Sequence, residues 1–568
     1  MKDIVCFGML GCMGRFGMFF AAGLVVASIA GCYQRPAWPP CVLEVTPECG
    51  DSGSSGGVGE SETETPGPIA TVTMVHPTSS TGTGDDGSES ISTSGSGELQ
   101  PPTIVDMTLT PNPLKSAGIV AVEVTVKDAG VAVSMTVDGG EPIALVPAQD
   151  SATLFEGEIV VFGESWNGEH EVVAIAMRDE EVSAPWPETF KVEAPAAGGE
   201  VWLDKSGPVP SFGNAVDVDD QGDIVELFTW SGMDGQQCLI RRRDSGGKKL
   251  WAGDGYQVAP GDCVGEAVKF APDGTIWVLV NVYENGFPRW QLWHLGAGGL
   301  PLGPPEVGGL THLGRGLDVN ADGDVLLCGT APATEDDDDA WVRLLPAAAK
   351  PWTETWDYVD PIEEEEHWFN ERTQDCAFVE DRIVVVGEAW GKHHNGGLES
   401  QNRGFVVEFS PAAAKLAEVV NPPAFAWHSS HQAVAPDGKG GYVAVGYNCE
   451  PMTTPCNNTR GALRWFSLGA TEVKMQPVTN ADVLNDVALS PAGYAVVAGV
   501  ALQIDQGFLV QAWSSDSSEP VLHYQSMQTQ LQVATGIATD PVGFIVAGGY
   551  YQEADDSLAA GVAMVHPY

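Results

Sequence analysis

The sequence is poor in basic residues. Only 27 Lys and Arg stand against 77 Asp and Glu in 568 residues, so the net charge is −50. Polyanions repel a chain of this charge, which excludes nucleic acid as a partner and excludes adhesion to anionic lipid head groups by charge alone. Most acidic side chains are expected on a solvated surface, so the function has to come from local groups of residues.

The N-terminal region lacks an apolar run long enough to span a membrane comfortably. A shorter run, Phe16–Ala27, is followed by small residues and Cys32, which is the pattern of a signal peptide. The ending Ile29-Ala30-Gly31-Cys32 resembles the bacterial lipobox. This resemblance implies cleavage before Cys32 and lipid on its thiol, and the alternative is an ordinary secretory signal with a chance cysteine. We expect residues 1–31 to be a lipoprotein signal peptide.

Residues near the N-terminus bear on the initiator methionine and on the membrane in which the protein is anchored. The initiator is either Met1 or Met13, because Asp3 is unusual in a positively charged signal-peptide start, whereas Met13-Gly14-Arg15 is typical. Tyr33 stands where an aspartate retains lipoproteins in the inner membrane of enteric bacteria. We therefore expect a lipid-anchored protein of the cell envelope, in the outer membrane, either periplasmic or surface-exposed.

No Cys-x-x-Cys motif or histidine at ligand spacing is present, which argues against zinc. Eight of the eleven cysteines remain once Cys6, Cys12 and Cys32 are set aside. An even number in an exported protein indicates disulfides. Pairing of sequence neighbours gives Cys41–Cys49, Cys238–Cys263, Cys328–Cys376 and Cys449–Cys456, and other connectivities stay open.

Two regions precede the main part of the chain. Residues 32–100 form the lipidated cysteine and a disordered linker, because residues 50–100 hold 30 Gly, Ser or Thr among 51 and cannot bury a core. Such a tether reaches roughly 40 Å. Residues 101–195 contain seven short alternating segments separated by turn signals, which predicts an immunoglobulin-like β-sandwich that acts as a spacer.

Residues 196–568 are repetitive. Seven copies of one pattern, about 50 residues apart, begin with an inner strand that a Gly-containing hairpin joins to a second strand, as in Gly213–Val218 and Ile224–Val225. A third apolar strand follows, and usually a shorter fourth. The last copy has no fourth strand, whereas a spare strand, Glu200–Leu203, precedes the first copy. The pattern predicts an all-β fold with a seven-bladed β-propeller closed by strands from both ends of the region.

A turn in the first copy carries a resemblance. Asp244-Ser245-Gly246-Gly247-Lys248-Lys249-Leu250-Trp251 resembles the Asp-x-x-Thr-Gly-Lys-x-x-Trp turn of PQQ-like propeller repeats, with Gly246 in place of threonine. In that family the motif is structural and does not imply the cofactor. Together with the lipobox and the tether, the degenerate repeats resemble the propeller lipoproteins of myxobacteria. This resemblance implies a propeller of degenerate PQQ-like or WD40-like repeats.

A polar position at the start of each inner strand is the main site candidate. All seven residues are polar, whereas the position two residues further on is apolar. They would lie at one mouth of the central channel and bind a protein, a sugar or another small molecule, although a water-filled mouth is polar in any case. These residues are Asn214, Glu266, Arg315, Asp375, Gln432, Asn485 and Thr535.

Two further constellations are weaker. Asp318, Asn320 and Asp322 have the Asp-x-Asn-x-Asp-Gly spacing of a calcium loop, but they lack the bidentate glutamate and coincide with a hairpin turn that favours Asp-Gly by itself. His431 could pair with Asp375 or Glu266 for acid–base catalysis.

The preferred hypothesis is a membrane-anchored binding or scaffold protein, a monomer without a cofactor other than possible calcium. Its partners are the membrane, through the lipid, and an unknown protein or carbohydrate ligand. The alternative is a carbohydrate-active or other hydrolytic propeller enzyme that uses the channel face, and the sequence favours no catalytic residue strongly.

Overall fold

A computed structural model describes much of the chain beyond residue 99. The described ranges are 100–149, 151–179, 181–204, 210–232, 235–253, 255–333, 338–357, 369–392, 400–420, 429–449, 459–478, 480–501, 507–525, 532–552 and 557–567. The expected signal peptide and tether, with Cys32, Cys41 and Cys49, lie outside these ranges, and so does Cys456.

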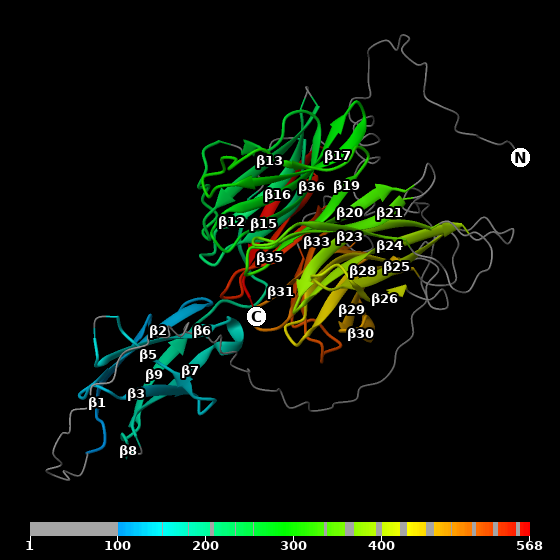
Figure 1. Cartoon of the computed structure of the whole chain (residues 1–568). Coiled ribbons are helices and arrows are strands. Elements are labelled where there is room, and N and C mark those ends of the chain that lie inside the picture. The colour runs from blue at the N-terminus through cyan, green and yellow to red at the C-terminus, as the bar shows by residue number, and fades with distance from the viewer. Residues whose placement is uncertain are drawn as a thin grey trace, which may run out of the picture.

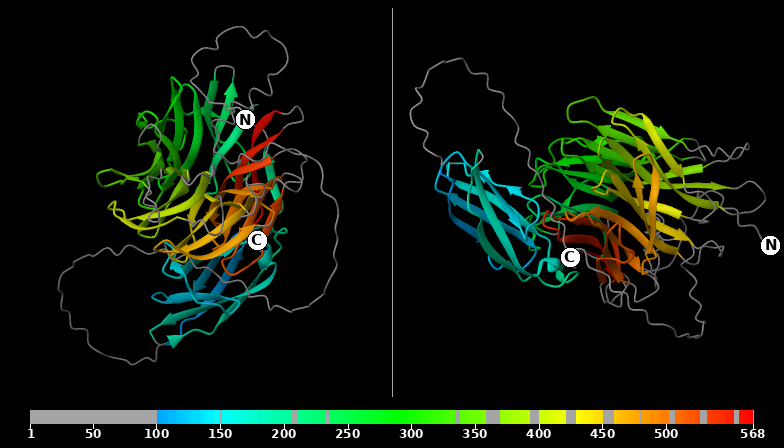
Figure 2. Two further views of the ribbon diagram at one scale, coloured as in Figure 1. Left: turned by 90° about the vertical axis from the view of Figure 1, so that its right-hand side faces the viewer. Right: turned by 90° about the horizontal axis from the view of Figure 1, so that it is seen from below.

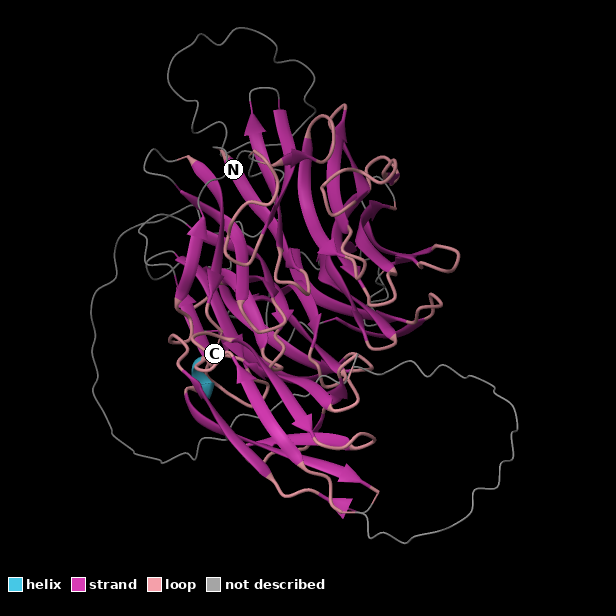
Figure 3. Cartoon of the chain, turned by 90° about the vertical axis from the view of Figure 1, so that its left-hand side faces the viewer, coloured by secondary structure: helices cyan, strands magenta, loops and turns pink. Residues whose placement is uncertain are grey.

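The predicted all-β class is confirmed. Strands make up nearly all regular structure in the described ranges, and the one helical element is a short 3-10 turn, η1 (Glu164–Trp166) (Figure 3). No helix among the described residues is long and apolar enough to cross a membrane.

The strands of residues 104–192 form two sheets around their own core (Figure 1). One sheet has the order β1-β2-β6-β5, and in the other β7 pairs with β3, β8 and β9 while β4 joins at β3. The bounds are β1 (Ile104–Thr110), β2 (Gly118–Val126), β3 (Ala132–Val137), β4 (Ile143–Ala144), β5 (Val146–Pro147), β6 (Leu154–Val161), β7 (Gly168–Arg178), β8 (Glu181–Val182) and β9 (Trp186–Val192).

The expected seven strands of this region become nine. One of the seven alternating segments, residues 142–146, changes sheets near Leu145, so the structure has two short strands there, β4 and β5. The second extra strand is β8, whose two residues extend the hairpin of β7.

The remaining strands form seven four-stranded antiparallel sheets in the described part of the chain, each named here after its first strand. The first three are β11 (Ser211–Val218), β12 (Ile224–Gly232), β13 (Gly235–Arg243) and β14 (Tyr256–Gln257); β15 (Cys263–Phe270), β16 (Ile276–Glu284), β17 (Phe287–Leu295) and β18 (Glu306–Val307); β19 (Leu313–Val319), β20 (Val325–Pro332), β21 (Asp338–Leu345) and β22 (Trp352–Trp356).

The next three continue the pattern, and the last takes a strand from elsewhere. They are β23 (Phe369–Val379), β24 (Arg382–Lys392), β25 (Ser400–Phe409) and β26 (Lys415–Val420); β27 (Ser429–Pro436), β28 (Gly441–Cys449), β29 (Thr459–Ser467) and β30 (Thr471–Val478); β31 (Val483–Leu489), β32 (Ala495–Ala501), β33 (Gly507–Trp513) and β34 (Leu522–Gln525); β35 (Gln532–Thr539), β36 (Ile545–Gln552), β37 (Leu558–Val565) and β10 (Glu200–Asp204).

The sheets follow one another in a propeller-like arrangement (Figures 1 and 2). Each first strand contacts the first strand of the next sheet, and β35 contacts β11. Their second strands are covered on both faces, which explains why β32 is a run of seven buried apolar or small residues instead of an alternating one. Near the centre the sheets approach closely: a Cβ on Gly213 would lie 2.2 Å from the Gly549 carbonyl oxygen.

The last sheet is completed by strand β10, which comes from the opposite end of the region. β10 pairs antiparallel with β37, from Glu200 opposite Val565 to Asp204 opposite Val562. The neighbouring β11 sheet also holds it. Asp204 forms an ion pair with Arg243, and the Trp202 indole N–H donates to the Ser245 carbonyl oxygen at 3.2 Å.

Two disulfides join neighbouring sheets. Cys238 of β13 is bonded to Cys263 of β15, and Cys328 of β20 is bonded to Cys376 of β23, which confirms two of the expected pairs. All four cysteines are buried. Cys449 is also disulfide-bonded. Crosslinks of this kind suit an oxidising compartment.

Trp202 provides a test of the closing strand. Its ring packs against Gly247, where a Cβ would lie 2.9 Å from the indole. We expect W202A to lower the free energy of unfolding by roughly 1–3 kcal/mol, because it removes a partly buried aromatic side chain and its hydrogen bond. The neighbour Val201 is 39% exposed, so V201A is the matched control. Urea unfolding measures both, and equal losses in the two variants would contradict the role given to Trp202.

Candidate functional site

A cavity of about 300 Å³ lies among the first strands of the seven sheets. Each of these strands has a β-bulge at the same point, where one residue is skipped in the pairing with the second strand. The skipped residues form a ring of equivalent positions. They are Asn214, Glu266, Arg315, Gln374, Gln432, Asn485 and Thr535.

This ring matches the sequence-predicted ring except in the β23 sheet. The bulge falls on Gln374, so Asp375 stands one residue further along than expected. Asn214, Glu266, Arg315, Thr535 and Asp375 line the cavity. Gln432 and Asn485 are not among the lining residues: their amide N–H groups donate to Ser430 Oγ at 2.6 Å and to the Ala534 carbonyl oxygen at 2.8 Å.

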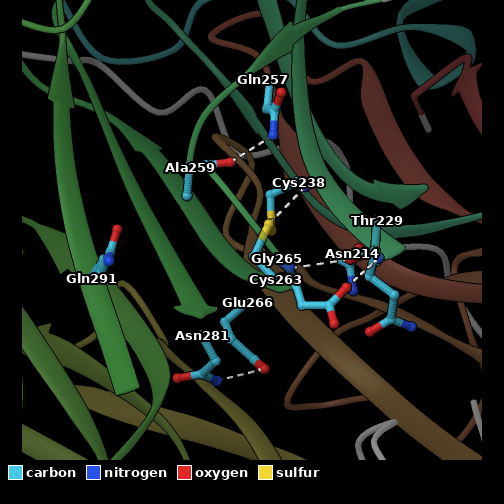
Figure 4. The surroundings of a disulfide bond; sticks show 12 residues. Asn214, Thr229, Cys238, Gln257, Ala259, Cys263, Gly265, Glu266, Asn281 and Gln291 are labelled. Atoms are coloured by element: carbon cyan, nitrogen blue, oxygen red, sulfur yellow. Dashed lines mark hydrogen bonds between the residues drawn. A yellow bond between two sulfur atoms is a disulfide. The ribbon is translucent and has the colours of Figure 1, made fainter. Parts of the chain in front are cut away.

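Neighbouring polar groups fix the ring residues in the β11 and β15 sheets (Figure 4). The Thr229 hydroxyl donates to Asn214 Oδ1 at 2.9 Å, and Asn281 Nδ2 donates to Glu266 Oε1 at 2.8 Å. The Arg315 guanidinium lies 3.4 Å from the other oxygen of Glu266. Glu266 is buried, so its carboxylate is held in place instead of being free to turn into solvent.

Four aspartates line the cavity beyond the bulges. Each accepts a hydrogen bond from a backbone N–H of the following sheet, and so satisfies part of the unpaired inner edge of that sheet. Asp217 accepts from Phe270 at 2.7 Å, Asp318 from Phe378 at 2.8 Å, Asp375 from Val434 at 3.0 Å and Asp486 from Ile537 at 2.8 Å.

A single ammonium group lies among these carboxylates. Lys269 Nζ is 3.4 Å from Asp217 Oδ1, and Asp217 raises the pKa of Lys269 most, with smaller contributions from Asp318, Asp486 and Asp375. The lysine side chain remains 35% exposed because it faces the cavity. Burial raises the pKa of Asp217 and Asp318, against the lowering effect of Lys269. Among the lining residues, the carboxylates of these four aspartates and Glu266 outnumber the cations Lys269 and Arg315.

The sequence contains a partial signal for these channel-facing aspartates and Lys269. Strand alternation places residues one and three positions after the bulge on the channel side, and the four aspartates and Lys269 occupy these positions. Of these five residues, the repeat pattern predicts only Asp375 at the channel, whereas the spacing of Asp318 predicts a calcium loop. Without the bulge position, the two channel-facing positions could not be identified.

The structure does not place His431 with Asp375 and Glu266 in the cavity. His431 is buried, and its Nδ1 contacts the Phe405 carbonyl oxygen of the preceding sheet at 3.0 Å. Burial lowers the pKa of His431 to about 3, so the ring is neutral at physiological pH. Asp375 lines the cavity instead and accepts the Val434 N–H. The expected His–carboxylate pair therefore has no support in this geometry.

The predicted calcium residues make hydrogen bonds within the fold. Asn320 Oδ1 accepts the backbone N–H groups of Asp322 at 3.0 Å and Asp324 at 2.9 Å. Asp219, Asp437 and Asp540 make the same kind of contact in three other hairpins. Asp318 faces the cavity instead of the turn. Turn geometry accounts for this motif, so calcium binding there stays a prediction.

Comparisons with known proteins leave the family open. No known family model matches the chain, and no curated protein matches it. Among solved structures, the polysaccharide lyase Uly1 is 10% identical, with 62% of this chain and 90% of that chain covered and a TM-score of 0.41.

Two other solved structures are similar at the same level. A protein of unknown function from Dyadobacter fermentans DSM 18053 is 9% identical over 66% of this chain and 98% of its own, with a TM-score of 0.37. A subtype N10 neuraminidase-like protein of A/little yellow-shouldered bat/Guatemala/060/2010 is 11% identical. The match covers 65% of this chain and 100% of that chain, with a TM-score of 0.33. Likenesses of this size carry no conclusion about activity.

Lys269 can be tested by removing its charge. In K269M, Asp217 and Asp318 lose the counter-charge of Lys269, so their raised pKa values rise further and their ionised forms destabilise the fold. An acid whose folded pKa is raised costs stability as pH rises through that pKa. We therefore expect K269M to unfold at a lower temperature than the wild type at pH 8 and to recover much of the difference at pH 5.

K269R keeps the charge and is the control for this variant. Thermal unfolding between pH 5 and pH 8 should show K269R close to the wild type throughout. A K269M deficit that does not change with pH would mean that lost packing, and not lost charge, explains the effect.

Proposed function

We propose that this chain is a lipid-anchored protein of the bacterial cell envelope whose seven-bladed β-propeller binds a small polar ligand in its central cavity. The cavity is the observation that carries the proposal. It lies at the centre of the ring, and its lining residues, both charged or polar and apolar, are on strands and not on loops. Groups held on rigid elements lose little entropy when a ligand binds.

Sheet order supports the seven-bladed ring. Seven four-stranded sheets are present in the described residues, and contacts between first strands run from β11 to β35 and back to β11. Four strands in each sheet around a central cavity is the architecture of a propeller. Strand β10 completes the last blade and would close the ring in the way the repeat pattern predicts.

The parts before the ring would act as an anchor and a spacer. Two sheets packed around one core suit an immunoglobulin-like sandwich, although the Cys-Trp-Cys framework of antibody domains is missing from residues 101–195. The proposal places lipid on Cys32, a flexible tether after it, and the outer membrane as the address. The protein would act as a monomer.

The PQQ-like turn supports a structural role for its motif. Asp244 Oδ1 accepts the Lys248 N–H at 2.9 Å, and the Trp251 indole N–H donates to the Ala297 carbonyl oxygen of the next sheet at 3.2 Å. The motif therefore fixes a turn and joins two sheets. This agrees with a degenerate propeller repeat whose motif is structural.

The charge of the cavity constrains the ligand. Five carboxylates face two cations, and this excess opposes a ligand with a negative charge. The ring residues offer both hydrogen-bond donors and acceptors, because they include an amide, a hydroxyl and a guanidinium. A neutral or amine-bearing sugar or a small peptide fits this chemistry better than an acidic one. The neutral, buried His431 makes a hydrolytic function the less favoured alternative.

Matched sugar probes test the cavity. We expect glucosamine to raise the melting temperature of the mature protein at millimolar concentration and glucuronate to leave it unchanged, because the two differ chiefly in the sign of their charge. Differential scanning calorimetry measures both. Ala538 lines the cavity, so A538L narrows it from within and should remove the glucosamine effect. Stabilisation by glucuronate, or an undiminished effect in A538L, would contradict binding in the cavity.

Lipidation is tested separately at Cys32. In C32S the thiol is missing, so we expect the chain in the soluble fraction of its bacterial host and without label after growth with a palmitate analogue. The wild type should be labelled and membrane-bound. C41S keeps the lipobox and is the control. A labelled, membrane-bound C32S protein would show that Cys32 is not the anchor.

A further inference from the structure

Three carboxylates from two neighbouring sheets meet away from the central cavity. Asp339 of β21, Asp357 just after β22 and Glu371 of β23 each place a carboxylate oxygen within 4.8 Å of the others. Glu371 is completely buried, Asp339 is partly buried and Asp357 is exposed. The group therefore extends from the joint between the β19 and β23 sheets to the surface.

Three like charges at this distance repel one another unless a cation is close. Arg403 is the nearby basic residue that the pairing identifies: it lies opposite Ala389, and Glu371 lies opposite Ala389 on the other side. Asp339, Glu371 and Arg403 each also take part in further interactions. A cation bound between the carboxylates would relieve this repulsion.

An unpartnered hydroxyl on the same face gives independent support. Thr373 is completely buried, and its Oγ1 has no hydrogen-bond partner in the described part of the chain. Thr373 follows Glu371 by two residues, before the bulge, so strand alternation directs both side chains toward the β19 sheet. A buried hydroxyl without a partner is costly, and a bound ion or its water would satisfy it.

The oxygen donors favour calcium over a transition metal. Carboxylate and hydroxyl oxygens are hard ligands, and no cysteine or histidine is in the group. Magnesium keeps several waters and is usually bound through one or two carboxylates, so a group of three protein carboxylates fits calcium better.

We propose that Asp339, Asp357 and Glu371 bind a calcium ion at the joint of the β19 and β23 sheets, with Thr373 as a buried oxygen near the ion. This site is distinct from the turn of Asp318, Asn320 and Asp322 that the sequence suggested. It does not depend on the ligand proposed for the central cavity. The ion would join sheets that the Cys328–Cys376 disulfide already links.

Calcium binding to the full mature chain, stripped with a chelator, tests the proposal. Isothermal titration with CaCl2 should show one site in the wild type, with an affinity at least about ten-fold lower in D357N and E371Q because each loses a charged ligand. T373V should weaken binding less. CaCl2 should also raise the melting temperature of the wild type more than the same concentration of MgCl2.

D381N is the matched control, because Asp381 is an exposed aspartate in the turn between β23 and β24. D381N should bind calcium as the wild type does. If E371Q does not fold, D357N still tests the site, since Asp357 is exposed. Absence of the site in the wild type, equal losses in D357N and D381N, or a loss in D381N alone would overturn the proposal.

Discussion

The pairing of β10 with β37 is the constraint on which the rest of the structure depends. It joins residues 200–204 to residues 562–565, so the first and last parts of the repeat region share one sheet. Without this strand the last sheet would have an open edge, and sheet edges without partners are prone to wrong pairing. Asp204 and Trp202 extend the joint to the first sheet, because they contact Arg243 and Ser245. The contact between β35 and β11 and the enclosed cavity follow from this closure.

The inner edge of the ring shows how structure and function share residues. First strands have no strand partner on their channel side, so their backbone N–H groups need other acceptors. Asp217, Asp318, Asp375 and Asp486 supply four of them across the sheet boundaries. The same carboxylates give the cavity its negative character, and Lys269 offsets part of it. A site of this kind is already oriented before a ligand arrives, since the fold itself requires these side chains in place.

Much of the fold followed from the sequence because it depends on local patterns. The repeat of apolar strands and Asp-Gly turns predicted the all-β class, and the two confirmed disulfides join cysteines of adjacent sheets that are neighbours in the cysteine order. The site was harder. A bulge shifts the channel-facing positions by one residue, and only the pairing shows that it falls on Gln374 and not on Asp375. The sequence makes His431 a candidate for a His–carboxylate pair, but packing between two sheets turns its ring to the Phe405 carbonyl oxygen. The group of Asp339, Asp357 and Glu371 spans two sheets, so no spacing in the sequence could reveal it.

The central claim is that a closed ring of seven sheets surrounds a polar cavity able to hold a ligand. A crystal structure of the mature chain grown with glucosamine tests it most directly. The account predicts β10 paired with β37, seven sheets around the cavity, and density for the sugar among Asp217, Asp375, Asp486 and Lys269. A ring with six or eight sheets, β10 outside the last sheet, or a cavity closed by side chains would contradict it.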